Sequence, residues 1–335
     1  MYQLFVILLS ATFFTGLLAI PFINLLYKLR FRYKRVINQD EKVGITVSQL
    51  HEDKAGTPTG GGILIIGSVL LFSILYYRLT IFSLNWASYI LLLSLVLFGG
   101  IGLYDDLRKM IRVHGKKLRT FPKLPKLILQ LLFGLLIGYM IYTLLGINSL
   151  TIPFFNITIN LGIFYILFAM LLIVFMSNAF NITDGLDGLA TGLLLIALTA
   201  YWVLAQDGFY ALDVAIFIAV IMGSLIAFLY FNIYPARIFM GDTGSMALGA
   251  TLAVISLILN QPLVVPIIGG VFVIEFVTSF IQLISKKFRN GKRVFKIAPL
   301  HFHFQAEGWD ETKVTMRFWL FGIICAFWGL IIATF

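Results

Sequence analysis

Apolar runs long enough to cross a lipid bilayer recur along almost the whole chain, and they constrain its fold more than any other feature. Ten runs are separated by charged residues, Gly, Pro or Asn, and they cover approximately 2–27, 61–82, 84–104, 127–149, 160–180, 186–206, 209–230, 244–261, 263–284 and 315–335. A spanning helix needs roughly 20 such residues. Hydrophobic residues make up 60% of the 335 positions and charged residues only 12%, which excludes a water-soluble globule. The alternating pattern of a spanning β-barrel is absent. We therefore predict an all-α, polytopic integral membrane protein with about ten transmembrane helices.

Basic residues fall almost entirely on alternate connections between these runs. Of the 25 Lys and Arg residues, 24 lie on or beside the connections that follow the odd-numbered runs, and Arg78 is the exception. The positive-inside rule makes that face cytoplasmic and puts both termini on the extracytoplasmic side. The first run lacks a cleavage site and continues into Lys28, so we expect a retained helix. Residues 1–335 are thus predicted to form a single transmembrane domain, whose net charge of +10 reflects topology, not nucleic-acid binding. Setting topology and attracting anionic lipids would account for the basic residues without any active site.

Carboxylates concentrate on the same connections, which topology alone does not explain. Twelve of the 15 acidic residues lie there. Five of them stand at the ends of runs, in short Gly-rich segments: Asp105, Asp106, Asp184, Asp187 and Asp242. Adjacent Asp105 and Asp106 repel each other, and they are best tolerated beside a divalent cation or beside basic side chains such as Lys109. The alternative is a solvated helix end with local ion pairs.

Amides and carboxylates also replace the apolar pattern between residues 178 and 188. Asn178 and Asn181 are three residues apart, as are Asp184 and Asp187, so each pair can share one face of a helix end. A capped hairpin turn is the alternative. Four such side chains exceed what a cap requires, which favours a functional site.

A further polar segment runs from Asn232 to Ser245. The stretch from Gly241 opens a helix, whose unpaired N–H groups can bind an anion, while Asp242 can ligate a hard cation through oxygen. Phe239 suits either core packing or stacking on a nucleobase, and the sequence does not decide between them.

Two other connections carry candidate phosphate-binding groups. His301 and His303 lie on one side of an extended segment but diverge on a helix. No Cys, third neighbouring His or HExxH accompanies them, so phosphate binding fits better than zinc, and a structural pair stays equally open. Lys54 precedes a Gly- and Thr-rich stretch that can wrap phosphate oxygens without being a Walker A motif, although a flexible hairpin is an alternative.

These five clusters fall on one face of the membrane, one on each odd connection. A carrier of polar solutes would place such residues near the bilayer midplane, on broken helices. Glu275 is the one acid inside a run, and we assign it no role. Carboxylates for a hard divalent cation, together with many Lys and Arg, suit phosphoryl transfer at a membrane surface.

In order along the chain, the clusters resemble the phospho-N-acetylmuramoyl-pentapeptide-transferases, the translocases of bacterial peptidoglycan synthesis within the polyprenyl-phosphate phosphosugar transferase superfamily. The matching motifs are His51-x-x-Lys54-x-Gly-Thr-Pro-Thr59, Asp105-Asp106, Asn178-x-x-Asn181-x-x-Asp184-Gly-Leu-Asp187, Phe239-Met-Gly-Asp242-x-Gly-Ser245 and Pro299-Leu-His301-x-His303-Phe. The resemblance implies transfer of phospho-MurNAc-pentapeptide from its UDP carrier to undecaprenyl phosphate, which makes lipid I and UMP with Mg2+. It also implies a homodimer in the bacterial cytoplasmic membrane.

The resemblance further implies a role for each matching residue. Asp242 is the expected magnesium ligand, and Asp105, beside Asp106, is the expected base or phosphate-activating carboxylate and a second metal ligand. Asp106 and His301 are implied as further catalytic residues. The implied substrate-binding residues are Asn178, Asn181 and Asp184 at the uridine end, Phe239 against uracil, Lys54, Thr59 and Asp187 around the nucleotide and sugar, the basic Lys109 and Lys126, and His303. The usual central histidine of a His-His-His run is Phe302 here, and Gln305 stands where Glu is common, so both contacts depart from the family pattern.

Two other functions are weighed against this expectation. A sibling enzyme would transfer GlcNAc-1-phosphate or another phosphosugar to a polyprenyl phosphate, sharing the aspartates but differing in the sugar pocket. A transporter or lipid scramblase would move its cargo without releasing UMP. The enzyme hypothesis requires Asp105, Asp184 and Asp242 to meet at one site.

Overall fold

The computed structural model describes residues 2–29, 31, 54, 56–80, 84–110, 112–113, 116–117, 121–153, 155, 157–206 and 208–334, and helices dominate them. The helices are α1 (Tyr2–Lys28), α3 (Gly61–Leu79), α4 (Trp86–Met110), α5 (Lys123–Leu144), α6 (Phe164–Thr183), α7 (Leu189–Leu204), α8 (Ala211–Asn232), α9 (Gly241–Ile258), α10 (Val265–Ile268), α11 (Gly270–Phe288), α12 (Leu300–Ala306) and α13 (Glu311–Thr334). A 3-10 turn, η2 (Pro262–Val264), precedes α10. Two short antiparallel hairpins pair β1 (Arg112–Val113) with β2 (Lys116–Lys117), and β3 (Ser149–Ile152) with β4 (Ile157–Asn160).

The prediction of an all-α polytopic membrane protein is confirmed by the length and composition of these helices. In the described part of the chain, eight helices are long and apolar enough to cross a membrane, or nine if one bent pair counts as a single span. The count of ten is not reached because α7, in the predicted run 186–206, has 16 residues. That is shorter than the roughly 20 residues a straight crossing requires.

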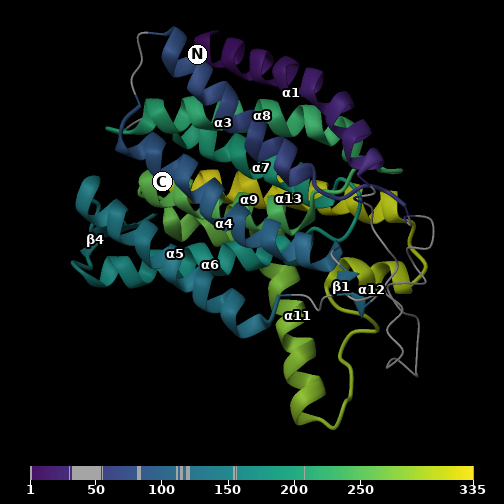
Figure 1. Ribbon diagram of the computed structural model, residues 1–335. Coiled ribbons are helices and arrows are strands. Elements are labelled where there is room, and N and C mark those ends of the chain that lie inside the picture. The colour runs from purple at the N-terminus through teal and green to yellow at the C-terminus, as the bar shows by residue number, and fades with distance from the viewer. Residues whose placement is uncertain are drawn as a thin grey trace.

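The predicted span 263–284 is bent, because the helix there is broken. The segments Pro262–Ile268 and Gly270–Phe288 meet at an angle of 78°. Pro262 and Pro266 lack the N–H that a continuous helix needs, and Gly269 and Gly270 tolerate the bend. As a result, the far half of α11 extends away from the bundle (Figure 1).

Helix α9 forms the centre of the bundle. Every residue from Thr243 to Ile258 is buried, as expected for a helix of small and apolar residues that has no polar face. It packs against α3, α4 and α6. Backbones approach closely near its start: a Cβ on Gly62 would lie 2.1 Å from the nitrogen of Gly244, and a Cβ on Gly102 would lie 2.1 Å from the carbonyl oxygen of Asp242. These glycines therefore bring α3 and α4 against the first turn of α9.

The two ends of the bundle differ in what they carry. Both chain termini and the β3–β4 hairpin lie at the left of Figure 1, whereas β1 and α12 lie at the right. β1, between α4 and α5, and α12, before α13, belong to connections that the sequence marks as rich in charge.

Candidate active site

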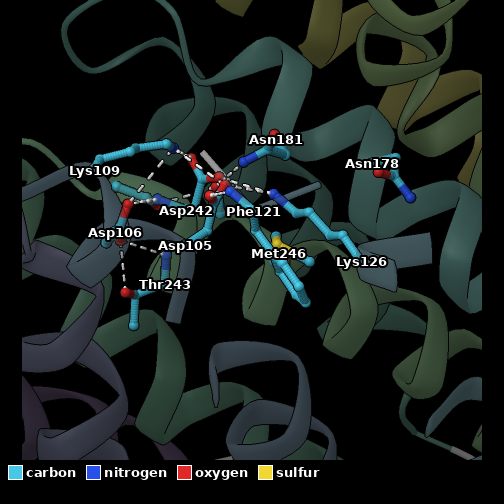
Figure 2. Close-up of polar contacts among 12 residues, drawn as sticks. Asp105, Asp106, Lys109, Phe121, Lys126, Asn178, Asn181, Asp242, Thr243 and Met246 are labelled. Carbon is cyan, nitrogen blue, oxygen red and sulfur yellow. Dashed lines mark hydrogen bonds and ion pairs between the residues drawn. The ribbon is translucent and has the colours of Figure 1, made fainter. Parts of the chain in front are cut away.

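Asp105 and Asp242 converge where the last turns of α4 meet the start of α9. Lys126, in the first turn of α5, donates to both of them: its Nζ lies 3.0 Å from Oδ2 of Asp105 and 2.9 Å from Oδ2 of Asp242. Lys109 approaches from the other side, 3.0 Å from Oδ1 of Asp242 and 3.4 Å from Oδ2 of Asp105. Figure 2 shows the two lysines flanking the carboxylates. The remaining oxygen of Asp105 accepts the backbone N–H of Phe121 at 2.8 Å, which holds the start of α5 to α4.

Asp106 points to a different set of donors. Its Oδ1 accepts the N–H of Asp242 at 3.1 Å, and its Oδ2 accepts both the N–H and the hydroxyl of Thr243 at 2.9 and 2.7 Å. The first N–H groups of a helix have no partner within the helix, and a carboxylate there also interacts favourably with the helix dipole. Asp106 thus caps α9 from a neighbouring helix and fixes the position of Asp242.

The two asparagines of α6 take different partners. Asn181 donates to the hydroxyl of Ser245 at 2.7 Å, and Ser245 donates to the carbonyl of Gly241 at 3.0 Å. Asn178 instead donates to Oε1 of Gln130 at 3.0 Å, on α5. Asn181 therefore belongs to the first turn of α9, while Asn178 joins α6 to α5.

A second charged cluster lies beside the first and contains one residue that the sequence analysis missed. Lys54 donates to Oδ1 of Asp187 at 2.6 Å and to Oε1 of Glu311 at 2.5 Å. The N–H of Asp187 also donates to Oε1 of Glu311 at 2.7 Å, and the other oxygen of Asp187 accepts the N–H of Ala236 at 2.9 Å. Glu311 opens α13, more than a hundred residues from its partners, so no local pattern signals it.

Phe239 and Thr59 are brought together by backbone pairing. They form a parallel β-bridge, and the carbonyl of Phe239 accepts the N–H groups of Gly60 and Gly61 at 3.1 and 2.9 Å. The ammonium of Lys54 lies 5.8 Å from the centre of the Phe239 ring. The Gly- and Thr-rich stretch and the segment before α9 thus form one wall of the site. His51, the first residue of that motif, lies outside the described residues.

Asp184 is partly buried between the two charged clusters. Burial raises the pKa of its carboxyl group to about 7; the negative charges of Asp242 and Asp106 add to the shift, and the positive charge of Lys54 opposes it. Asp184 is therefore close enough to Asp242 for their charges to interact. Of the three aspartates that the enzyme hypothesis requires at one site, Asp105 and Asp242 share the ammonium of Lys126.

The two histidines diverge because residues 300–306 are helical. His301 is fully buried and pairs through Nδ1 with Oε2 of Glu275 at 3.0 Å. His303 is partly exposed, and its Nδ1 accepts the N–H of Lys296 at 3.3 Å. The pair does not converge on a common ligand.

An apolar groove of about 480 Å³ opens between α4 and α5, next to the carboxylates. Its lining consists of Val96, Leu97, Gly100, Ile101, Tyr104, Phe121, Leu129 and Phe133. The rings of Tyr104 and Phe121 meet edge to face at 4.9 Å. Because the N–H of Phe121 binds Asp105, the groove ends directly at the charged site.

Two of the carboxylates could hold a hard divalent cation such as Mg2+. This ion is usually held by one or two carboxylates together with substrate phosphates and waters. Across the described ranges, no group of three or more His, Cys, Asp or Glu side chains is arranged to hold a metal. Asp105 and Asp242, which share the same ammonium groups, supply the two-carboxylate arrangement.

Comparisons with known proteins indicate the family of this chain. Residues 88–260 match the model of glycosyl transferase family 4. A protein of Listeria monocytogenes named phospho-N-acetylmuramoyl-pentapeptide-transferase is 38% identical over 331 residues, which cover 97% of each chain. Proteins of the same name from Desulforapulum autotrophicum and Leptospira biflexa are 42% identical over 294 residues and 37% identical over 350 residues, covering 83% and 95% of this chain and 80% and 89% of theirs.

The fold and site thus define a membrane-embedded enzyme that transfers a phosphosugar. The chain belongs to glycosyl transferase family 4, in the branch of the phospho-N-acetylmuramoyl-pentapeptide-transferases.

Proposed function

We propose that this protein transfers phospho-MurNAc-pentapeptide from UDP-MurNAc-pentapeptide to undecaprenyl phosphate, with lipid I and UMP as products. The observation that carries the proposal is the convergence of Asp105 and Asp242 between Lys109 and Lys126 at the end of an apolar groove. Anionic and cationic groups suit a metal-bound pyrophosphate, and the groove suits a lipid tail. The identity to the Listeria protein along nearly the whole chain supports the same reaction.

In this proposal Asp242 and Asp105 hold Mg2+, which neutralises charge on the pyrophosphate when bound. Lys109 and Lys126 then bind phosphate oxygens of the two substrates. An oxygen of the lipid phosphate attacks the phosphorus attached to MurNAc, a new P–O bond forms, and the bond to the UMP phosphate breaks. The lipid phosphate is already anionic at neutral pH, so direct attack needs no base. Asp105 then orients the acceptor through Lys126.

The nucleotide is proposed to occupy the side of the site formed by α6, the 184–188 turn and the segment before α9. Asn181 and Asp184 would bind the uridine end and Phe239 would stack on uracil. Lys54, Thr59 and Asp187 would line the sugar pocket, His303 would contact the donor from α12, and Asn178 would support the adjacent wall. Two observations support this division. Asp184 is close enough to Asp242 for their charges to interact, and the Phe239 ring lies 5.8 Å from the ammonium of Lys54.

The remaining expectations follow from the same assignment. We propose that residues 1–335 act as one catalytic domain in the bacterial cytoplasmic membrane, with the site on the cytoplasmic face and both termini outside. Both termini lie at the opposite end of the bundle from α12, which supports this orientation (Figure 1). We further propose that the protein is a homodimer.

The test is a product assay with purified protein, Mg2+, undecaprenyl phosphate and radiolabelled donor. UDP-MurNAc-pentapeptide is expected to give labelled lipid and UMP, whereas UDP-GlcNAc gives neither. Lipid product from UDP-GlcNAc alone would identify the sibling activity. Labelled protein formed with donor in the absence of the lipid acceptor would replace direct attack by a covalent intermediate.

A further inference from the structure

Glu275 is a carboxylate buried inside a broken membrane span. It lies on α11, five residues beyond the bend, and neither it nor His301 has any exposed side-chain surface. Ionisable residues inside membrane segments are costly unless they are paired, and they frequently mark functional sites. Both oxygens of Glu275 bind His301: Oε1 accepts the backbone N–H at 3.2 Å, and Oε2 lies 3.0 Å from Nδ1. The position and the ring orientation of His301 are therefore set by this single side chain.

The pairing bears on which ring nitrogen of His301 carries the proton. A carboxylate that faces Nδ1 in its ionised form can only accept a hydrogen bond, and this arrangement favours the form of the neutral ring with the proton on Nδ1. In the neutral ring, Nε2 then has a free lone pair. Nε2 is buried and has no hydrogen-bond partner among the residues that the structure describes. A buried polar atom without a partner is costly, and its presence calls for an explanation.

Nε2 faces the Asp184–Gly185 turn. A Cβ on Gly185 would lie 2.3 Å from Nε2 and 3.0 Å from the tip of the Phe302 ring. The Phe302 ring also packs edge to face on the imidazole, with 4.1 Å between the ring centres. The unpartnered nitrogen thus lies against the turn that carries Asp184, under the side chain that replaces the usual central histidine.

We propose that Glu275 is a positioning residue, which holds His301 in its Nδ1–H form and directs Nε2 to the Asp184–Gly185 turn as a hydrogen-bond acceptor for the donor nucleotide sugar. The proposal rests on the proposed function for the identity of the donor. Nε2 becomes accessible to a hydroxyl or N–H of the donor when the Phe302 ring turns aside. A glutamate suits the role because its two oxygens accept both the backbone N–H and the Nδ1–H of His301, whereas a glutamine has only one oxygen. The NH2 group of a glutamine would then face Nδ1 and favour the form of His301 with the proton on Nε2.

The first test reads the proton position directly. The chain has four histidines, so protein labelled with 15N-histidine gives few imidazole signals, and His301→Gln identifies those of His301. The parent is expected to show a protonated Nδ1 and a bare Nε2, and Glu275→Gln is expected to move the proton to Nε2. The matched control is Ser279→Ala, which removes a buried α11 hydroxyl that has no partner in the described chain, and it should leave the signals unchanged. A proton on Nε2 in the parent, or the same form in Glu275→Gln, would overturn the proposal.

The second test measures binding of UDP-MurNAc-pentapeptide by titration calorimetry, with Mg2+. Glu275→Gln is expected to weaken binding about 10-fold, the lower end of the cost of removing a partner that orients a metal-bound histidine. In a His301→Gln background the same change should have little further effect, because Glu275 acts through His301. An equal loss in both backgrounds would overturn the assignment. Neither the proton position nor binding requires turnover, so absence of lipid I would contradict the proposed function without deciding the role of Glu275.

Discussion

The Nζ of Lys126 lies 2.9 Å from Oδ2 of Asp242, and this contact joins the first turn of α5 to the first turn of α9. The same ammonium also binds Asp105, so three helices meet at one charged group. Removing the charge of either carboxylate weakens this junction and replaces an anionic ligand for a cation by a neutral amide.

Asp242→Asn and Asp105→Asn are each expected to abolish transfer while leaving the protein folded and inserted in the membrane. Loss of a group that stabilises charge in the transition state costs about 100- to 1000-fold or more in turnover. The measurement is lipid I formation at several Mg2+ concentrations, with helical content from circular dichroism as the folding check. The control is Asp310→Asn, an exposed carboxylate outside the site. Near-normal turnover of purified Asp242→Asn would refute the metal assignment.

Asp106→Asn is expected to reduce thermal stability more than Asp105→Asn does. Asparagine has one acceptor oxygen, whereas the Asp106 carboxylate accepts three hydrogen bonds from the start of α9. Loss of a helix cap typically costs about 1–2 kcal/mol. The melting temperature in detergent measures the effect, and Thr243→Val, which removes one of the three bonds, should fall between Asp106→Asn and the parent. If Asp106→Asn lost turnover with an unchanged melting temperature, a direct chemical role would replace the capping role.

Asp184→Asn is expected to become more stabilising as the pH rises. The folded protein raises the pKa of Asp184 to about 7 from an ordinary value of 3.8, so between those values the folded state holds a proton that the unfolded state has lost. The Asp184 carboxyl group therefore destabilises the folded state most at pH 7 and above, where it must ionise in the folded protein. Melting temperatures of Asp184→Asn and the parent should differ more at pH 7.5 than at pH 5.5, and the difference should level off above that. A constant difference across this range would contradict the raised pKa.

Gly100→Leu tests the groove between α4 and α5. A Cβ at Gly100 meets nothing within 4 Å, so the larger side chain can enter the groove without disturbing the helices. The KM for undecaprenyl phosphate is expected to rise about 10-fold while the KM for the nucleotide donor stays unchanged. Gly67→Leu, on α3, has equal space around it and lies outside the groove, so it serves as the control. Equal changes in both KM values would show that the groove does not hold the lipid.

Hydropathy predicted most of the helices because the length of an apolar run is a local property. The same property conceals the break near Gly269, since the run 263–284 stays apolar through the bend and only its prolines and glycines differ. The short α7 was over-extended for the same reason. The hairpin of β3 and β4 was missed because its strands lie at the margins of apolar runs.

The acidic residues of the site could be located by sequence, but their partners could not. Asp105 and Asp106 are neighbours, yet successive residues on a helix point about 100° apart, and only the position of α9 decides which of them becomes a cap. Glu311 and Glu275 were not assigned because their partners, Lys54 and His301, are distant along the chain. Contacts of this kind depend on helix packing, which no local pattern records.

The lysines that flank Asp105 and Asp242 have a consequence for the order of events. Two ammonium groups balance these two carboxylates, so a lone divalent ion would have to displace cations from their preferred anions. A nucleotide that arrives with its ion offers those ammonium groups phosphate oxygens in exchange. The protein is thus expected to have low affinity for the free divalent ion. Binding of the ion and binding of the nucleotide should increase together.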